Sequence, residues 1–140
     1  EERNMKLNEG GEKSEVYSIG KINQKIYKCI TEDIITEEVI ITENQIQHIK
    51  DRHPEAYNKV IEKYTGDNKY PDYIIRDKHA YTGLIIKRIQ TEEGFLQIVL
   101  RLCTSGDEHG YKNSVISCWK ISERRLQNYL RNKEILYSRE

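Results

Sequence analysis

The sequence predicts an α+β fold in which an N-terminal helical pair packs on a four-stranded antiparallel β-sheet, with a C-terminal helix after the last strand. Two observations predict this class. Apolar residues recur at helical spacing before residue 65 and after residue 122. Between these segments, short runs alternate apolar and polar side chains and are joined by short connections, as in an antiparallel meander. We expect the helices on one face of the sheet, which leaves the other face free for a site.

The helical pair is predicted at residues 43–52 and 54–63. Thr42 can cap the first helix, because its hydroxyl accepts from amides of the first turn. The first helix should end at His53, since a residue that precedes proline is pushed out of the α region, and Pro54 suits the first position of the second helix. The β-branched run at residues 37–41 is predicted as a short strand.

The strands of the sheet are predicted at residues 73–76, 81–89, 94–103 and 113–121. In the last strand, strict alternation places Ser117 and Trp119 on one face and Ser114 on the other. Ser122 then caps a helix that runs to about residue 133. Residues 134–140 are predicted as a short tail.

The chain of 140 residues has room for one domain. Residues 1–14 are charged and contain glycine, so we expect a flexible lead-in or linker before a single domain at residues 15–140. At the start of that domain, residues 16–22 and 25–30 alternate in part and are predicted as a hairpin. Because the chain begins at Glu1, we expect it to be the C-terminal part of a larger chain.

Composition excludes several classes of protein. The chain has 23 Lys and Arg against 23 Asp and Glu, which excludes an indiscriminate polycation and leaves only a local basic surface for nucleic acid. No run of about 18 apolar residues could span a membrane. Cys29, Cys103 and Cys118 form neither a zinc motif nor an even disulfide framework, although one pair could bridge.

The densest cluster of chemically useful side chains lies in the first helix and at its end. His48 and Arg52 share the polar side of that helix, where a solvated pair is the alternative interpretation. His53 continues the apolar side, where a packed corner histidine is the alternative. The HxxxxH spacing lacks the same-face geometry of HExxH, so we predict no metal and no cofactor.

A second cluster lies on the strands. Lys112, Ser114 and Ser117 suit contacts with phosphate, and Trp119 can stack on a base. Lys87 and Arg101 add positive charge to neighbouring strands. The alternatives are a tolerated serine, a solvated basic face and a core tryptophan.

These motifs resemble a known family. The corner HIxxRHP after a VIIT strand, followed by YPDYII, GYKNSVISCWKIS and a C-terminal ILY, is similar to the phage-associated barnase, EndoU, colicin and RelE-like nuclease superfamily. The resemblance covers about residues 30–138. It implies a small metal-independent endoribonuclease, found in phage-derived proteins and as the C-terminal toxin of secreted proteins.

The resemblance also assigns site residues. The catalytic candidates are His48, His53, Arg101, Lys112, Ser114 and Ser117. The substrate-binding candidates are Arg52, Lys87, Trp119 and Tyr137. His48 would act as acid or base, with His53 or Tyr137 as its partner, while the ribose 2′-OH attacks its own phosphodiester. Arg101 and Lys112 would stabilise charge that grows on the phosphate oxygens.

The expected partners follow from this resemblance. They are RNA, with tRNA as one candidate, and a cognate immunity protein, with no membrane. The nuclease would act in the cytoplasm after delivery from a secreted or phage-borne parent protein. The alternative function is a non-catalytic protein-interaction module of immunity or phage type, supported by the zero net charge. A hydrolase with Cys118 as nucleophile is a weaker alternative, since no local motif supports it.

Overall fold

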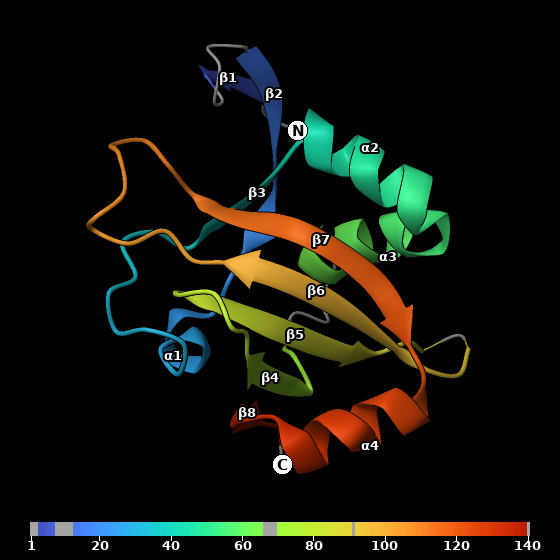
Figure 1. Cartoon of the computed structure of the whole chain (residues 1–140). Coiled ribbons are helices and arrows are strands. Elements are labelled where there is room, and N and C mark those ends of the chain that lie inside the picture. The colour runs from blue at the N-terminus through green and yellow to red at the C-terminus, as the bar shows by residue number, and fades with distance from the viewer. Residues whose placement is uncertain (1–2, 8–12, 66–69, 91, 140) are drawn as a thin grey trace.

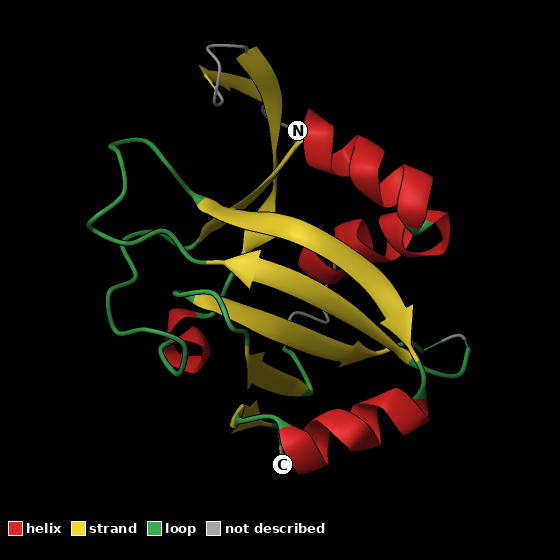
Figure 2. Cartoon of the chain, in the orientation of Figure 1, coloured by secondary structure: helices red, strands yellow, loops and turns green. Residues whose placement is uncertain are grey.

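The computed structural model describes residues 3–7, 13–65, 70–90 and 92–139, and within them the chain forms one mixed sheet with helices on both faces (Figures 1 and 2). The described residues give eight strands in the order β1-β2-β3-β7-β6-β5-β4-β8. The elements in chain order are β1 (Arg3–Leu7), β2 (Lys13–Lys21), α1 (Gln24–Tyr27), β3 (Glu38–Thr42), α2 (Glu43–Arg52), α3 (Pro54–Thr65), β4 (Tyr73–Arg76), β5 (Thr82–Arg88), β6 (Phe95–Arg101), β7 (Asn113–Ile121), α4 (Glu123–Asn132) and β8 (Ile135–Ser138).

The predicted four-stranded sheet behind an N-terminal helical pair is wrong. The described N-terminal residues are strand, and β1, β2 and β3 extend the sheet beyond β7. At the opposite edge, β8 pairs with β4, although residues 134–140 were predicted as a tail. Of the predicted lead-in, residues 1–2 and 8–12 lie outside the described residues.

The predicted hairpin between residues 16–22 and 25–30 is also wrong. The first segment is part of β2, whereas the second contains the short helix α1. The physical reason is Asn23, whose side chain accepts from the backbone amides of Lys25 and Ile26 and so caps a helix. β2 pairs instead with β3, the strand predicted at residues 37–41.

The meander and its flanking helices occupy the predicted segments. Strands β4 to β7 follow one another as antiparallel neighbours. At α2, Thr42 and Gln45 form a capping box, in which the threonine hydroxyl accepts from the Gln45 amide at 3.2 Å. At α4, the Ser122 hydroxyl accepts from the Arg125 amide at 3.1 Å.

Each face of the sheet carries its own hydrophobic cluster. On one face, Ile46 and Ile49 of α2 and Ala56 of α3 pack against Ile98 and Leu100 of β6. On the other face, which was predicted to be free, Leu126 and Tyr129 of α4 pack against Phe95, Leu84 and Ile86. We call these the α2–α3 face and the α4 face. Helix α4 covers only part of its face, because Val99, Trp119 and Arg101 on that side remain partly exposed.

The parallel contact between β3 and β7 is short. The two strands pair at Val39 with Asn113 and at Ile40 with Ser114, and β7 then continues to Ile121. The buried Asn113 side chain reinforces this point, since it donates to the Thr36 carbonyl at 2.8 Å and accepts from the Cys103 amide at 2.8 Å. The corner between α2 and α3 lies beside the remaining part of β7 (Figure 1).

Candidate functional site

A β-bulge in β7 decides which of its side chains share a face. Val99 of β6 pairs with Ser117, whereas the next residue, Leu100, pairs with Val115, so Ile116 is an extra residue in β7. Directly paired residues point to the same face. Ser117 therefore shares the α4 face with Val99, and Val115 shares the α2–α3 face with Leu100.

The bulge corrects the predicted alternation of β7. Ser114, which pairs with Arg101, lies on the same face as Ser117 and Trp119, whereas strict alternation put it on the opposite face. The prediction was wrong because an inserted residue shifts the alternation by one position. The bulge therefore places Ser114 on the α4 face, together with Ser117 and Trp119.

His53 and Trp119, two of the predicted site residues, contact each other through their rings. Their ring centroids lie 5.4 Å apart with an interplanar angle of 35°. His53 can reach β7 because it ends α2 with non-helical backbone, with φ −143° and ψ 60°. Its amide still donates to the Ile49 carbonyl. Pro54 then begins α3, so the sharp corner that the sequence predicted fixes the imidazole against the indole.

His48 and Arg52 lie on the same helix and are exposed. Because Ile46 and Ile49 face the core, the i, i+4 pair of His48 and Arg52 occupies the solvated side of α2. Arg52 directly precedes His53 in the chain. The C-terminal half of α2 thus carries His48 and Arg52 as exposed polar side chains before the histidine that contacts Trp119.

Two buried polar atoms lie on the sheet next to Trp119. Gln97 pairs with Trp119, and Ser117 lies two residues before Trp119 on the same face. Gln97 is 1% exposed and Ser117 is 9% exposed. Within the described residues, the Gln97 Oε1 and Ser117 Oγ atoms have no hydrogen-bond partner. Buried polar groups are normally paired, because an unpaired one costs about 1–3 kcal/mol. Both atoms are enclosed by the protein, so they become candidates for contact with a ligand when the side chains that cover them move aside.

Gln97 was not among the predicted site residues. The signal that could have identified it is its place in β6, where a polar side chain interrupts a face otherwise formed by Phe95 and Val99. A buried glutamine at such a position needs a partner.

Arg101 lies at the opposite end of the same face, where a carboxylate neutralises it. Its Nη1 and Nη2 atoms donate to Oδ2 and Oδ1 of Asp107 at 3.1 and 2.9 Å. The hydrogen bond to Asp107 raises the pKa of Arg101. Hydrogen bonds from Arg101 and from the Thr104 amide lower the pKa of Asp107. Arg101 therefore fixes the loop that precedes β7, and its charge is already balanced.

Three other predicted residues lie apart from the His53 and Trp119 contact. Lys112 Nζ lies 3.3 Å from Glu38 Oε1. Lys87 pairs with Leu96, so it belongs to the α2–α3 face, where its Nζ donates to the Tyr70 carbonyl at 2.8 Å and burial lowers its pKa. Tyr137 lies on β8, separated from β7 by β6, β5 and β4.

The predicted residues on the α4 face and at the corner beside β7 thus fall into two groups. His53, Ser117 and Trp119 gather near the C-terminal half of β7, whereas Arg101 and Ser114 lie at its beginning. Ser114 and Trp119 are about 15 Å apart along the strand at the usual rise per residue. Ser117 lies between them on this face, and one phosphate cannot contact both Ser114 and Trp119.

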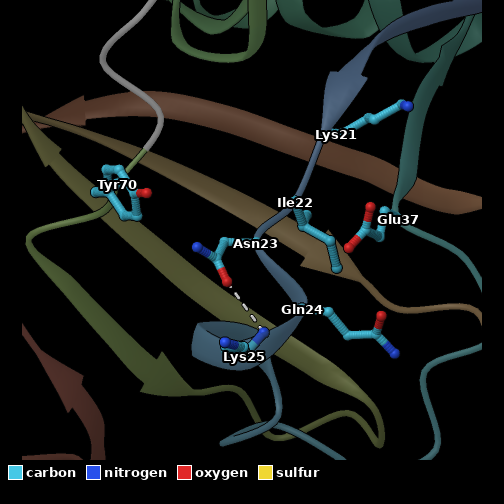
Figure 3. A pocket seen from close by; sticks show the side chains of 7 residues that line it. All are labelled: Lys21, Ile22, Asn23, Gln24, Lys25, Glu37 and Tyr70. Atoms are coloured by element: carbon cyan, nitrogen blue, oxygen red, sulfur yellow. Dashed lines mark hydrogen bonds between the residues drawn. The ribbon is translucent and has the colours of Figure 1, made fainter.

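In the part of the chain that the structure describes, three grooves have no predicted site residue in their lining. One groove, of about 500 Å³, lies between the end of β2 and Tyr70. Figure 3 shows the side chains that line it. Its Asn23 side chain is already engaged, because it caps α1 through the Lys25 amide (Figure 3). A second groove lies along α4, and a third lies between Tyr17 of β2 and Tyr57 of α3.

The buried thiol of Cys118 does not belong to the α4 face. Its Sγ lies 3.8 Å from the Ala56 carbonyl, on the α2–α3 face. Burial raises its pKa to about 12. The thiolate, which is the nucleophilic form, is therefore scarce at neutral pH, and this argues against a Cys118 hydrolase.

Among the residues that the structure describes, no three histidine, cysteine or carboxylate side chains gather as metal ligands would. No helix in the described ranges combines the length and the apolar character needed to cross a membrane. Comparison with protein-family models, curated proteins and solved structures finds no match for this chain.

Proposed function

We propose that this chain is a metal-independent endoribonuclease whose reaction centre is the contact between His53 and Trp119. The observation that carries this proposal is an imidazole placed 5.4 Å from an indole, beside two buried polar atoms that have no described partner. An imidazole can take or give a proton near neutrality, and an aromatic ring beside it offers a surface for a base.

In the proposed reaction, His53 removes the proton from the ribose 2′-OH. The 2′-oxygen attacks the adjacent phosphorus, a 2′,3′-cyclic phosphate forms, and the bond to the 5′-oxygen breaks. The departing 5′-oxygen takes a proton from a second acid. His48 is the candidate: its backbone lies about 8 Å from that of His53 along the axis of α2, on the solvated side of the helix, so the RNA would pass around the end of α2 to reach both imidazoles.

Arg52 is the cation best placed to stabilise charge on the phosphate in this scheme. It is exposed and adjacent to His53, whereas the guanidinium of Arg101 is held by Asp107. Once the side chains that cover them move aside, the Ser117 hydroxyl can donate or accept a hydrogen bond and the Gln97 side-chain carbonyl can accept one, which would fix the nucleotide against Trp119. Fixed donors near developing charge contribute most to such a reaction.

The test is cleavage of end-labelled RNA, tRNA included, by the purified chain in the presence of a chelator. We expect products that end in 2′,3′-cyclic phosphate, and no cleavage of the same sequence as DNA, which lacks the nucleophile. His53→Ala and His48→Ala should each slow cleavage by about 10² to 10⁴-fold, the usual contribution of a general acid or base.

The matched control is His109→Ala, which removes an exposed histidine from the loop before β7. Its cleavage rate should equal that of the unchanged chain. Full activity of His53→Ala, with its thermal unfolding unaltered, would refute the proposed reaction centre. Stoichiometric binding to a protein without RNA turnover would instead support the interaction module.

A further inference from the structure

Helix α4 presents three arginines around one groove. Arg124, Arg125 and Arg131 line an opening of about 530 Å³, together with Ser122, Asn128 and Tyr129. All three arginines are exposed. None of them belongs to the site residues assigned by the family resemblance.

The sequence of α4 explains why these side chains face solvent. Leu126 and Tyr129 pack into the α4 face, with Leu130 partly buried against it. Arg124, Asn128 and Arg131 recur at i, i+4 and i+7, so they follow one side of the helix. Burial of one side of an amphipathic helix leaves the other side as a basic surface.

The charge of this groove is not balanced within the described residues. The arginines that form ion pairs among the described residues are Arg76, Arg88, Arg101 and Arg139, and none of them lines the groove. Glu123, the acidic residue of α4, accepts a hydrogen bond from Gln127 and lies 3.9 Å from Arg88. Three exposed arginines around one opening give it a positive potential, which favours a polyanion in the groove.

The groove begins close in the chain to the proposed reaction centre, because Ser122 of its lining lies three residues after Trp119. Trp119 packs in the same cluster as Leu126 and Tyr129, and α4 begins four residues after Trp119 in the chain. The start of α4 and the corner between α2 and α3 lie at the same end of β7 (Figure 1). A strand whose base contacts Trp119 would therefore carry its neighbouring phosphates towards α4.

We infer that the α4 groove binds the phosphate backbone of single-stranded RNA next to the cleaved nucleotide, an inference that rests on the proposed function. Guanidinium groups match phosphate because their planar donors can bind two of its oxygens at once. Three arginines around one opening suit successive phosphates of a strand. The recognition is of the backbone, so it does not select the sequence.

The experiment measures binding separately from cleavage. A fluorescent single-stranded oligonucleotide of 2′-O-methyl RNA, which lacks the nucleophile, is titrated with the chain at several salt concentrations. The test variant combines Arg124→Gln, Arg125→Gln and Arg131→Gln. The control combines Lys21→Gln, Lys28→Gln and Lys78→Gln, three exposed cations outside α4. Both variants remove the same charge.

The arginine variant should bind at least about tenfold more weakly at 0.1 M salt, and its salt slope should fall by about 2, as expected for the loss of three phosphate contacts to a single strand. The lysine control should bind nearly as tightly as the unchanged chain. Equal losses in the two variants would overturn the inference, as would tighter binding of anionic lipid vesicles or an acidic protein than of the oligonucleotide.

The two proposals fail in different ways. If the chain does not cleave RNA but the arginine variant alone loses binding, the result supports RNA binding by the groove and refutes the nuclease activity. If RNA is cleaved and the arginine variant binds as tightly as the control, the result supports the nuclease activity and refutes RNA binding by the groove.

Discussion

The two faces of the sheet are built differently. The α2–α3 face is almost entirely aliphatic and closed, with Ile98 and Leu100 fully buried beneath the helices. The α4 face is only partly covered, and it carries Arg101, Ser114 and the oxygens of Gln97 and Ser117, which have no partner among the described residues. The α2–α3 face therefore contributes most of the packing, whereas the α4 face keeps polar groups without a described partner at some cost in stability.

Truncation on the closed face should have the largest effect on stability. Leu100→Ala removes a fully buried side chain and should lower the free energy of unfolding by about 2–5 kcal/mol. Val99→Ala changes the neighbouring position, which faces α4 and is partly exposed, and should cost about 1 kcal/mol. Urea unfolding measures both values. Equal costs would contradict the difference between the faces.

The free energy of unfolding should also depend on alkaline pH, because Cys118 is buried on the closed face. Its pKa is about 12 in the folded chain against an ordinary value of 9.0, so the unfolded state loses its thiol proton first as pH rises. Stability is therefore retained below pH 9 and lost between pH 9 and 12, by about 1.4 kcal/mol per pH unit. Cys118→Ala should remove this component. The measurement is urea unfolding at pH 8 and pH 10, and parallel changes in the two proteins would refute it.

The smallest effect on stability is expected on the α4 face. Ser117→Ala removes a hydroxyl that has no described partner, so the free energy of unfolding should change by less than about 1 kcal/mol. If Ser117 contacts the nucleotide, RNA cleavage should nevertheless fall by about tenfold, the value of one hydrogen bond. A large loss of stability without loss of cleavage would assign Ser117 to the core.

Local signals allowed much of the central fold to be predicted. The capping residues Thr42 and Ser122 and the corner at Pro54 act within a few residues of chain, and each has the predicted structural role. The alternation of β6 likewise indicates its two faces correctly. The corner also accounts for the position of His53, although its contact with Trp119 could not be predicted from either segment alone.

Features that depend on distant segments were missed. The strand β3 was predicted, but its parallel pairing with β7 joins segments that no local pattern connects. The apolar residues of β8 are too few to show that they pair with β4. At α1, alternation favoured a strand, and the cap at Asn23 outweighed it. The bulge at Ile116 leaves no clear sequence pattern, and it determines which face Ser114 shares.

The short contact between β3 and β7 has a consequence for the order of folding. Asn113 donates to the Thr36 carbonyl across 77 residues of sequence, whereas strands β4 to β7 form from consecutive segments. Closing a long loop costs entropy before its contacts form, so distant pairings slow folding. We therefore expect the meander to form first. The N-terminal strands would then dock on β7 in a later step that the amide of Asn113 helps to complete.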